Sequence, residues 1–284
     1  MLTDRNVSAL AVDPAGRLWV GYFDRGLDLL DAGATRPTHF EDSHLFCINR
    51  IAFADDGRRS AVATANGLVL FDANARPQQV LGRAQGLIAD HVTDVAFSPA
   101  GMAVATPAGL TFLDASGARS LYAFHGLVNN HAYALGSSGG RLMVGTLGGI
   151  SVLTDGVVRA SYTTSNSHLT HNWITAIAPV GDEWFAGTYG GGVLRLDSSG
   201  EWQSFQDLPA DLVVNPNALA ATEARIYVGT LDRGLYVYDR ASRRWSNWTS
   251  GLPSANVTAL AVSRGYLYVG TDNVLVRISE QSLP

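Results

Sequence analysis

The sequence contains no lysine, so its 20 basic residues are all arginine, and 25 acidic residues outnumber them. Recognition of nucleic acid needs a concentrated positive patch, and no basic run occurs, so we expect no nucleic-acid partner. No apolar stretch approaches the roughly 18 residues that a membrane-spanning helix requires. The first residues also lack the apolar core of a signal peptide. The sequence therefore predicts neither a membrane-spanning segment nor a secretion signal.

Cysteine and glutamate are scarce, and their scarcity limits the chemistry that the chain can perform. Cys47 is the single cysteine, which excludes an internal disulfide and any multi-cysteine zinc or iron–sulfur site. Only five glutamates occur, and none falls in a predicted site loop. No nucleophile elbow or phosphate-binding loop is present. We therefore expect no cofactor, no metal and no catalytic residue, and the chain favours a non-catalytic function.

What the sequence does contain is a repeat. One apolar run followed by a short strand that ends in a small residue recurs along the whole chain. Seven small residues, spaced 40 to 42 positions apart, mark the copies: Gly21, Ala63, Ala105, Gly145, Gly187, Gly229 and Gly270. A period in this range, with short alternating runs between turns, is typical of a propeller blade. A small residue here is what close packing between neighbouring blades requires.

Each copy has the pattern of four short strands separated by Gly, Pro, Asp and Asn turns, and no window shows helical periodicity. The sequence thus predicts an all-β fold: a seven-bladed β-propeller of four-stranded antiparallel blades, formed as one domain by residues 1–284. The last copy has a third strand and then only six residues. We therefore expect the last blade to lack its outer strand.

Two runs resemble a known family. Residues 251–262 (GLPSANVTALAV) and 16–27 (GRLWVGYFDRGL) are similar to the two-component-regulator propeller repeat. That resemblance implies a bacterial ligand-binding sensor domain used in signal transduction, located in the periplasm or another extracytoplasmic compartment. The family usually adds a second propeller, an immunoglobulin-like domain, a transmembrane helix and a kinase. A fold by itself does not define a function, so only the sensing role carries over as an expectation.

Two sets of loops meet at the mouth of a propeller's central channel and supply the candidate ligand-binding residues. The position before each first strand holds Asn6, Cys47, His91, His131, Trp173, Asn215 and Asn256, with the sixth strand starting at Pro216. The fifth copy adds the loop residues His171 and Asn172. The loops between second and third strands add Tyr22, Arg25, Tyr189 and Arg233. These side chains either cap backbone groups within tight loops or face the channel as ligand-binding groups.

Three functions fit these residues. The first is a sensor that binds a small polar ligand, either sugar-like or an organic acid, at the mouth of the channel. In it, Trp173 and Tyr189 stack on a ring and Arg25 and Arg233 hold a carboxylate. The second is a scaffold that binds a protein partner through the rim or a blade edge. The third is a metal-assisted lyase or hydrolase at His91 and His131, whose pair lacks a carboxylate ligand.

Overall fold

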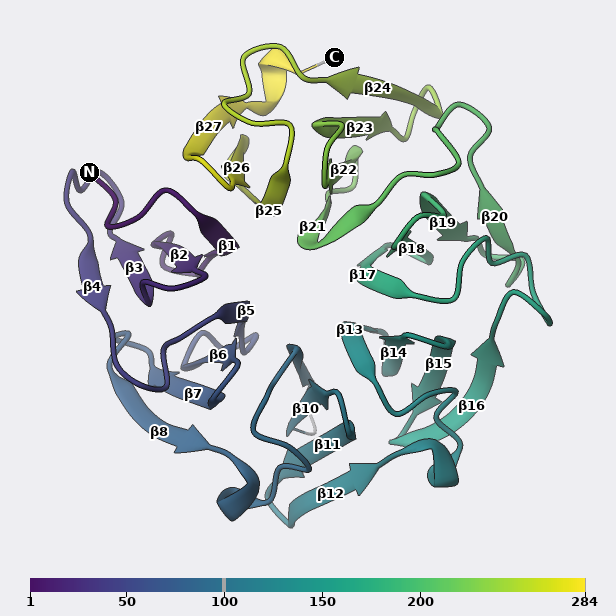
Figure 1. The fold of residues 1–284 in the computed structure, drawn as a ribbon, viewed down its shortest axis with the longest axis horizontal. Helices are drawn as coiled ribbons and strands as arrows, with labels where there is room; N and C mark the ends of the chain where they lie inside the picture. The colour runs from purple at the N-terminus through teal and green to yellow at the C-terminus, as the bar shows by residue number, and fades with distance from the viewer. Residues whose placement is uncertain (99–100, 284) are drawn as a thin grey trace.

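The computed structural model of the protein describes residues 1–98 and 101–283, which form a ring of β-sheets (Figure 1). Within each repeat, antiparallel strands succeed one another from the centre of the ring to its rim in chain order. The first strand of each repeat lies innermost. No helix in these ranges is both long and apolar enough to cross a lipid bilayer.

Five repeats form separate four-stranded sheets. The first contains β1 (Val7–Val12), β2 (Leu18–Tyr22), β3 (Leu27–Leu30) and β4 (Thr38–Phe40). The second contains β5 (Ile48–Phe53), β6 (Arg59–Thr64), β7 (Gly67–Asp72) and β8 (Pro77–Leu81), followed by the 3₁₀ turn η1 (Arg83–Gln85). The third contains β9 (Asp94–Ser98), β10 (Gly101–Thr106), β11 (Gly109–Asp114) and β12 (Gly117–Leu121), followed by η2 (Ala123–His125). The fourth contains β13 (Ala132–Ser138), β14 (Arg141–Thr146), β15 (Gly149–Thr154) and β16 (Val157–Tyr162). The fifth contains β17 (Ile174–Val180), β18 (Glu183–Thr188), β19 (Val193–Leu196) and β20 (Trp202–Ser204).

The sixth and seventh repeats are joined into one seven-stranded sheet with the order β24-β23-β22-β21-β25-β26-β27. Its strands are β21 (Val214–Ala221), β22 (Arg225–Thr230), β23 (Leu235–Asp239), β24 (Arg244–Trp248), β25 (Val257–Ser263), β26 (Tyr266–Thr271) and β27 (Leu275–Ser279). The two inner strands meet in a parallel pairing of Asn217 with Ala259. The prediction of seven separate four-stranded blades is therefore wrong. The described residues form five four-stranded sheets and one curled seven-stranded sheet.

The sixth repeat differs because its inner strand is interrupted over a longer stretch. In β1, the pairing with β2 breaks for one residue, between Val7 and Ala9. In β21, the corresponding break runs from Val214 to Leu219. The unpaired residues lie against β25 and create the parallel pairing. The strand thus begins at Val214 rather than at the predicted Pro216. The seventh repeat contributes three strands, and within the described ranges β27 is followed by the 3₁₀ turn η3 (Glu280–Ser282).

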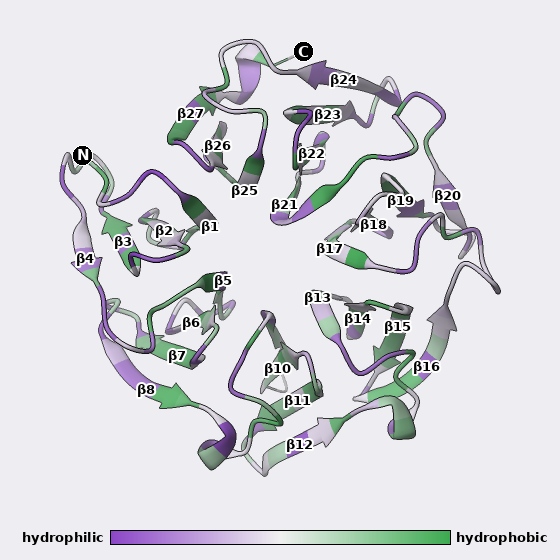
Figure 2. Cartoon of the chain, in the orientation of Figure 1, coloured by the Kyte–Doolittle hydropathy of each residue, from purple (hydrophilic) through white to green (hydrophobic). Residues whose placement is uncertain are grey.

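Packing between neighbouring sheets accounts for the small residue in the second strand. Every residue of β2 is buried, whereas β24 is largely accessible to solvent, and Figure 2 shows the outer strands β20 and β24 as hydrophilic. A Cβ atom added at Gly21 would lie 2.6 Å from Cγ2 of Ile48, which belongs to the next sheet. Larger side chains at this position would force the sheets apart.

Polar side chains near the start of several inner strands link one repeat to another. Thr93 donates a 2.8 Å hydrogen bond to the Ala132 carbonyl, and Thr258 bonds the Val7 carbonyl in the same way. Asn217 reaches farther, because its amide Nδ2 donates to the carbonyls of Ser8 at 2.9 Å and Asn49 at 2.6 Å. These three residues belong to the sixth, first and second repeats. The Asn217 amide therefore crosses the centre of the ring and connects strands that are distant in sequence.

Candidate ligand-binding site

An aromatic cluster occupies the face of the ring at which the inner strands begin, here called the mouth face. The rings of Trp173 and Tyr189 stack with centroids 4.1 Å apart and an interplanar angle of 19°. Tyr133 meets Trp173 edge-on at 5.9 Å, and His131 stacks on Tyr133 at 5.8 Å. We call His131, Tyr133, Trp173 and Tyr189 the mouth cluster. Its members come from the fourth and fifth repeats, so neighbouring sheets build one continuous surface.

Backbone hydrogen bonds hold Tyr189 in place. Its amide donates to the Trp173 carbonyl at 3.0 Å. The preceding Thr188 donates from Oγ1 to the Gly192 carbonyl at 2.8 Å and accepts from the Gly191 amide at 2.9 Å. The loop is therefore fixed while the Tyr189 side chain stays 43% exposed. Tyr189, rather than the half-buried Trp173, presents the accessible face of the stack.

Tyr133 lies at the break in β13, between the paired residues Ala132 and Ala134. Burial raises the pKa of its phenol, and the nearby Cys47 and Tyr189 add to that rise. Burial also raises the pKa of the Cys47 thiol, with a further contribution from the Asp24 carboxylate. Both groups are therefore neutral at pH 7. Cys47 belongs to the second repeat, whereas Tyr133 belongs to the fourth.

His91 and His131 begin the third and fourth repeats and lie near each other. Burial lowers the pKa of His131, and the charge of His91 lowers it further. A neutral imidazole offers one donor and one acceptor to a polar ligand. Among the described residues, no group of three or more His, Cys, Asp or Glu side chains is placed to hold a metal ion. The hypothesis of a metal-assisted enzyme at this pair thus lacks a ligand set.

Two predicted residues support the loop before β17. Nδ1 of His171 accepts a 3.0 Å hydrogen bond from the Trp173 amide. Oδ1 of Asn172 accepts a 2.8 Å bond from the Thr164 amide. Both side chains thus accept hydrogen bonds from backbone amides of the loop. These bonds hold Trp173 in position.

The predicted asparagines have different partners. Asn215 donates from Nδ2 to the Val257 carbonyl at 2.8 Å and to Oδ1 of Asn256 at 2.9 Å. Asn256 donates in turn to Oδ2 of Asp272 at 3.2 Å. These contacts join the sixth repeat to the seventh. Asn6 is half-buried, and its backbone amide lies 3.4 Å from Oδ1 of Asp4.

The remaining predicted residues take no part in the stacking contacts of the mouth cluster. Tyr22 is fully buried, and its hydroxyl donates to Oδ2 of Asp28 at 2.7 Å, so it cannot contact a ligand at the surface. Arg233 forms a two-pronged ion pair with Asp211 at 2.8 and 2.7 Å, and both side chains are exposed. Arg25 is exposed on the loop after β2. We therefore leave Tyr22 out of the site, and Arg233 must give up Asp211 to bind an anion.

Tyr133 was not among the ligand-binding residues predicted from the sequence, although the repeat pattern marks it as unusual. The equivalent position holds a small or polar residue in the neighbouring repeats, such as Thr93 and Thr175, whereas the fourth repeat has a tyrosine. Arg50 and Asp94 were not predicted either, although most repeats have alanine at their position. Nε of Arg50 lies 3.4 Å from Oδ1 of the buried Asp94. Burial raises the pKa of Asp94, while Arg50 and two backbone amides act against that rise.

Comparison with known proteins supports the fold. The family model of the two component regulator propeller matches residues 1–24. The chain is similar to the extracellular domain of a hybrid two component system from B. thetaiotaomicron, with a TM-score of 0.79 and 20% identity. That alignment covers 98% of this chain and 40% of the other. A one component system domain from the same organism gives a TM-score of 0.77 and 19% identity, with 98% and 39% covered.

A third similar structure is PorZ, a surface component of the type-IX secretion system of Porphyromonas gingivalis, with a TM-score of 0.71 and 14% identity. The alignment covers 98% of this chain and 37% of PorZ. The chain thus spans about 40% of the length of these three structures. A search of curated proteins found no match.

Proposed function

Because the chain carries the two component regulator propeller repeat, we propose that it is a non-catalytic sensor domain that binds a small polar ligand on its mouth face. The extracellular domains that it resembles belong to one and two component systems, which supports a sensing function. Since the chain spans about 40% of those domains, we propose the sensing function alone for this propeller.

The observation that carries this proposal is the mouth cluster. A ligand with a flat or sugar-like ring stacks on the exposed face of Tyr189, which Trp173 supports from behind at 4.1 Å. His91 and His131 supply polar contacts at one end of the cluster. Aromatic stacking with a few hydrogen-bonding groups beside it is the usual composition of a small-molecule site.

A calorimetric screen of sugars, oligosaccharides and organic acids tests the proposal. Tyr189→Ala is expected to lower the affinity for any hit by at least about fivefold, since an aromatic stack contributes on the order of 1 kcal/mol beyond its buried area. Trp173→Ala should weaken binding similarly by removing the support. Phe124→Ala is the matched control, because Phe124 is 88% exposed on η2 at the rim. Unchanged affinity in both mouth variants would refute the site.

A second candidate function, a protein-interaction scaffold, is favoured by exposed apolar side chains on the same face. Four of them come directly after the second strand of a repeat, and they are Phe23, Leu147, Tyr189 and Leu231. The fifth, Phe46, precedes β5, and each of the five side chains is at least 36% exposed. Exposed apolar residues that gather on one face indicate a contact surface. Sedimentation velocity at rising concentration tests a second copy as partner. Association lost in Leu231→Ser and kept in Val157→Ser supports a scaffold, and a monomer throughout refutes self-association.

A further inference from the structure

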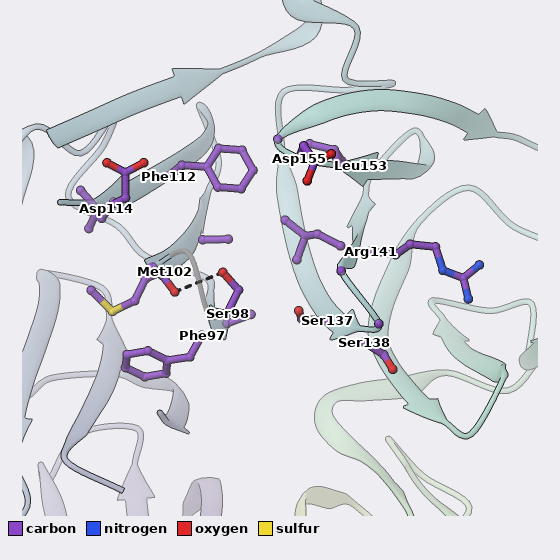
Figure 3. Close-up of a pocket in the computed structure, with 18 of the residues that line it drawn as sticks. Phe97, Ser98, Met102, Phe112, Asp114, Ser137, Ser138, Arg141, Leu153 and Asp155 are labelled. Atoms are coloured by element: carbon purple, nitrogen blue, oxygen red, sulfur yellow. Dashed lines mark hydrogen bonds between the residues drawn. The ribbon is translucent and has the colours of Figure 1, made fainter. Parts of the chain in front are cut away.

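A cavity lies between the third and fourth repeats (Figure 3). Its lining residues stand where the inner strands β9 and β13 end, so it is on the face opposite the mouth cluster. It is formed at the ends of the β9–β10 and β13–β14 hairpins, and its volume is about 760 Å³. This volume is within the range of small-molecule sites. Ala103, Leu142 and Leu153 form its buried apolar floor, and Phe112 forms part of its wall.

The repeat explains why a cavity occurs here. Strand pairing places Ala103 opposite Ala96 and Phe112, as it places Trp19 opposite Ala11 and Leu29 in the first repeat. In five repeats this position holds a large side chain: Trp19, Met143, Phe185, Tyr227 and Tyr268. Trp19, for example, fills the space between the first two sheets, with its ring 5.2 Å from that of Phe71. Ala103 fills far less of the equivalent space, which borders the cavity.

The other repeat with alanine at this position is filled from its neighbour. Ala61 belongs to a buried cluster that includes Met102, with Phe97 packed against it. Beside Ala103 the fourth repeat supplies Leu142, the equivalent of Met102. The place of Phe97 is taken by the small Ser137, which lines the cavity. The vacancy therefore lies where an aromatic side chain is found in other repeats. Phe112 is available for an edge-on contact with a ring bound there.

The charged groups of the cavity favour a cation. Arg119 stacks on Phe112 at 4.9 Å and donates to the Gly156 carbonyl, so its guanidinium is already engaged. Arg141 lies over the Trp184 ring, and Figure 3 shows its guanidinium turned away from the cavity. The Asp155 carboxylate lines the rim and takes part in no ion pair within the described residues. The balance of available charge is negative.

We propose that the cavity between the third and fourth repeats binds an aromatic amine, whose ring fills the vacancy beside Ala103 and whose ammonium group pairs with Asp155. The hydroxyl of Ser98, which occupies the place where Asp13 accepts from the Trp19 indole, can accept from a ring N–H group. The site is separate from the mouth cluster and does not depend on the function proposed for it.

Calorimetry on the full chain with tryptamine tests both parts of the proposal. Indole-3-acetate has the same ring with the opposite charge, and hexylamine has the charge without the ring. We expect tryptamine to bind at least about tenfold more tightly than either, since a charge-assisted contact and a stacked ring each contribute about that factor. Equal binding of indole-3-acetate or hexylamine would overturn the assignment, and so would no binding of tryptamine.

Variants locate the binding site. Ala103→Trp fills the vacancy and should lower tryptamine affinity at least about tenfold. Ala103→Leu, a smaller change, keeps the test valid if the first variant does not fold. Asp155→Asn should weaken tryptamine about tenfold but leave neutral indole unchanged, and asparagine tolerates the positive φ of 52° at this position. Asp182→Asn is the matched control, an exposed carboxylate on the β17–β18 hairpin of the same face. Loss of tryptamine binding in Tyr189→Ala with retention in Ala103→Trp would place the amine at the mouth and refute the proposal.

Discussion

Asn217 gives the most direct test of how the ring is held together. Its side-chain amide donates to the backbone carbonyls of Ser8 and Asn49. These two residues belong to the first and second repeats, which lie across the centre of the ring from the sixth. The same residue pairs with Ala259 and joins the sixth repeat to the seventh. Replacing Asn217 by alanine removes both donors and leaves two carbonyls of inner strands without that partner.

The magnitude follows from the two bonds. Each contributes about 1 kcal/mol, so Asn217→Ala should lower the free energy of unfolding by about 2 kcal/mol. Unfolding entropy scales with chain length, and for 284 residues this loss corresponds to a fall of about 3–4 °C in Tm. Asn217→Asp should cost more at neutral pH, because it places a carboxylate against two carbonyl oxygens. The pKa of that new group is raised in the folded state, so its penalty should diminish as the pH falls.

Urea denaturation followed by tryptophan fluorescence measures both effects. Asn247→Ala is the matched control, because Asn247 donates one 3.0 Å bond to the Arg233 carbonyl in an exposed position. We expect this control to change stability by less than about 0.5 kcal/mol. If Asn217→Ala behaves like the control, or if Asn217→Asp is as stable as the alanine variant at pH 7, the amide does not hold the ring.

Two further predictions concern single sites in the sheets. Burial lowers the pKa of His39, but its hydrogen bonds to Glu41 and Asp28 outweigh burial and raise the pKa overall. The stabilisation should therefore be complete below the unfolded pKa of about 6.5 and disappear as the pH rises through the folded value. Urea titrations at several pH values should show this loss in the natural chain and not in His39→Gln. Gly145→Ala would place Cβ 2.6 Å from Cγ2 of Ile174, and calorimetric melting should show a loss of about 1–3 kcal/mol. Ile174→Ala in the same chain should restore part of that loss, whereas simple additivity would contradict the packing argument.

The sequence predicted the strands far better than the connections between sheets. Period and turn residues locate the strands because each depends on local pattern: a buried second strand, a small residue at its end and a glycine turn. The joining of the sixth repeat to the seventh has no such pattern. It depends on where the unpaired residues 215–218 lie after folding, and Asn-Pro-Asn looks like an ordinary turn in sequence.

The candidate site was predictable to a similar degree. Equivalence between repeats placed His131 and Trp173 together, since residues at the same point of neighbouring repeats must be close. It could not show whether a side chain turns outward or inward. Tyr22 shares its position with buried threonines and is itself buried, while Tyr189, the next position along in its own repeat, is exposed. Orientation at a loop depends on hydrogen bonds such as that from Thr188 to Gly192, which no periodicity reveals.

Departures from the repeat carry more information about function than the repeat itself. Gly21 and its equivalents are small because neighbouring sheets pack closely at this position, which is a requirement of the fold and not of a particular ligand. By contrast, Tyr133 stands where neighbouring repeats have threonine, and it completes the mouth cluster. Ala103 stands where most repeats have a large side chain, and it lines the cavity between the third and fourth repeats. A residue that differs from those at the same position of the other repeats is not required by the fold. Such residues therefore indicate where on the surface a ligand should be sought.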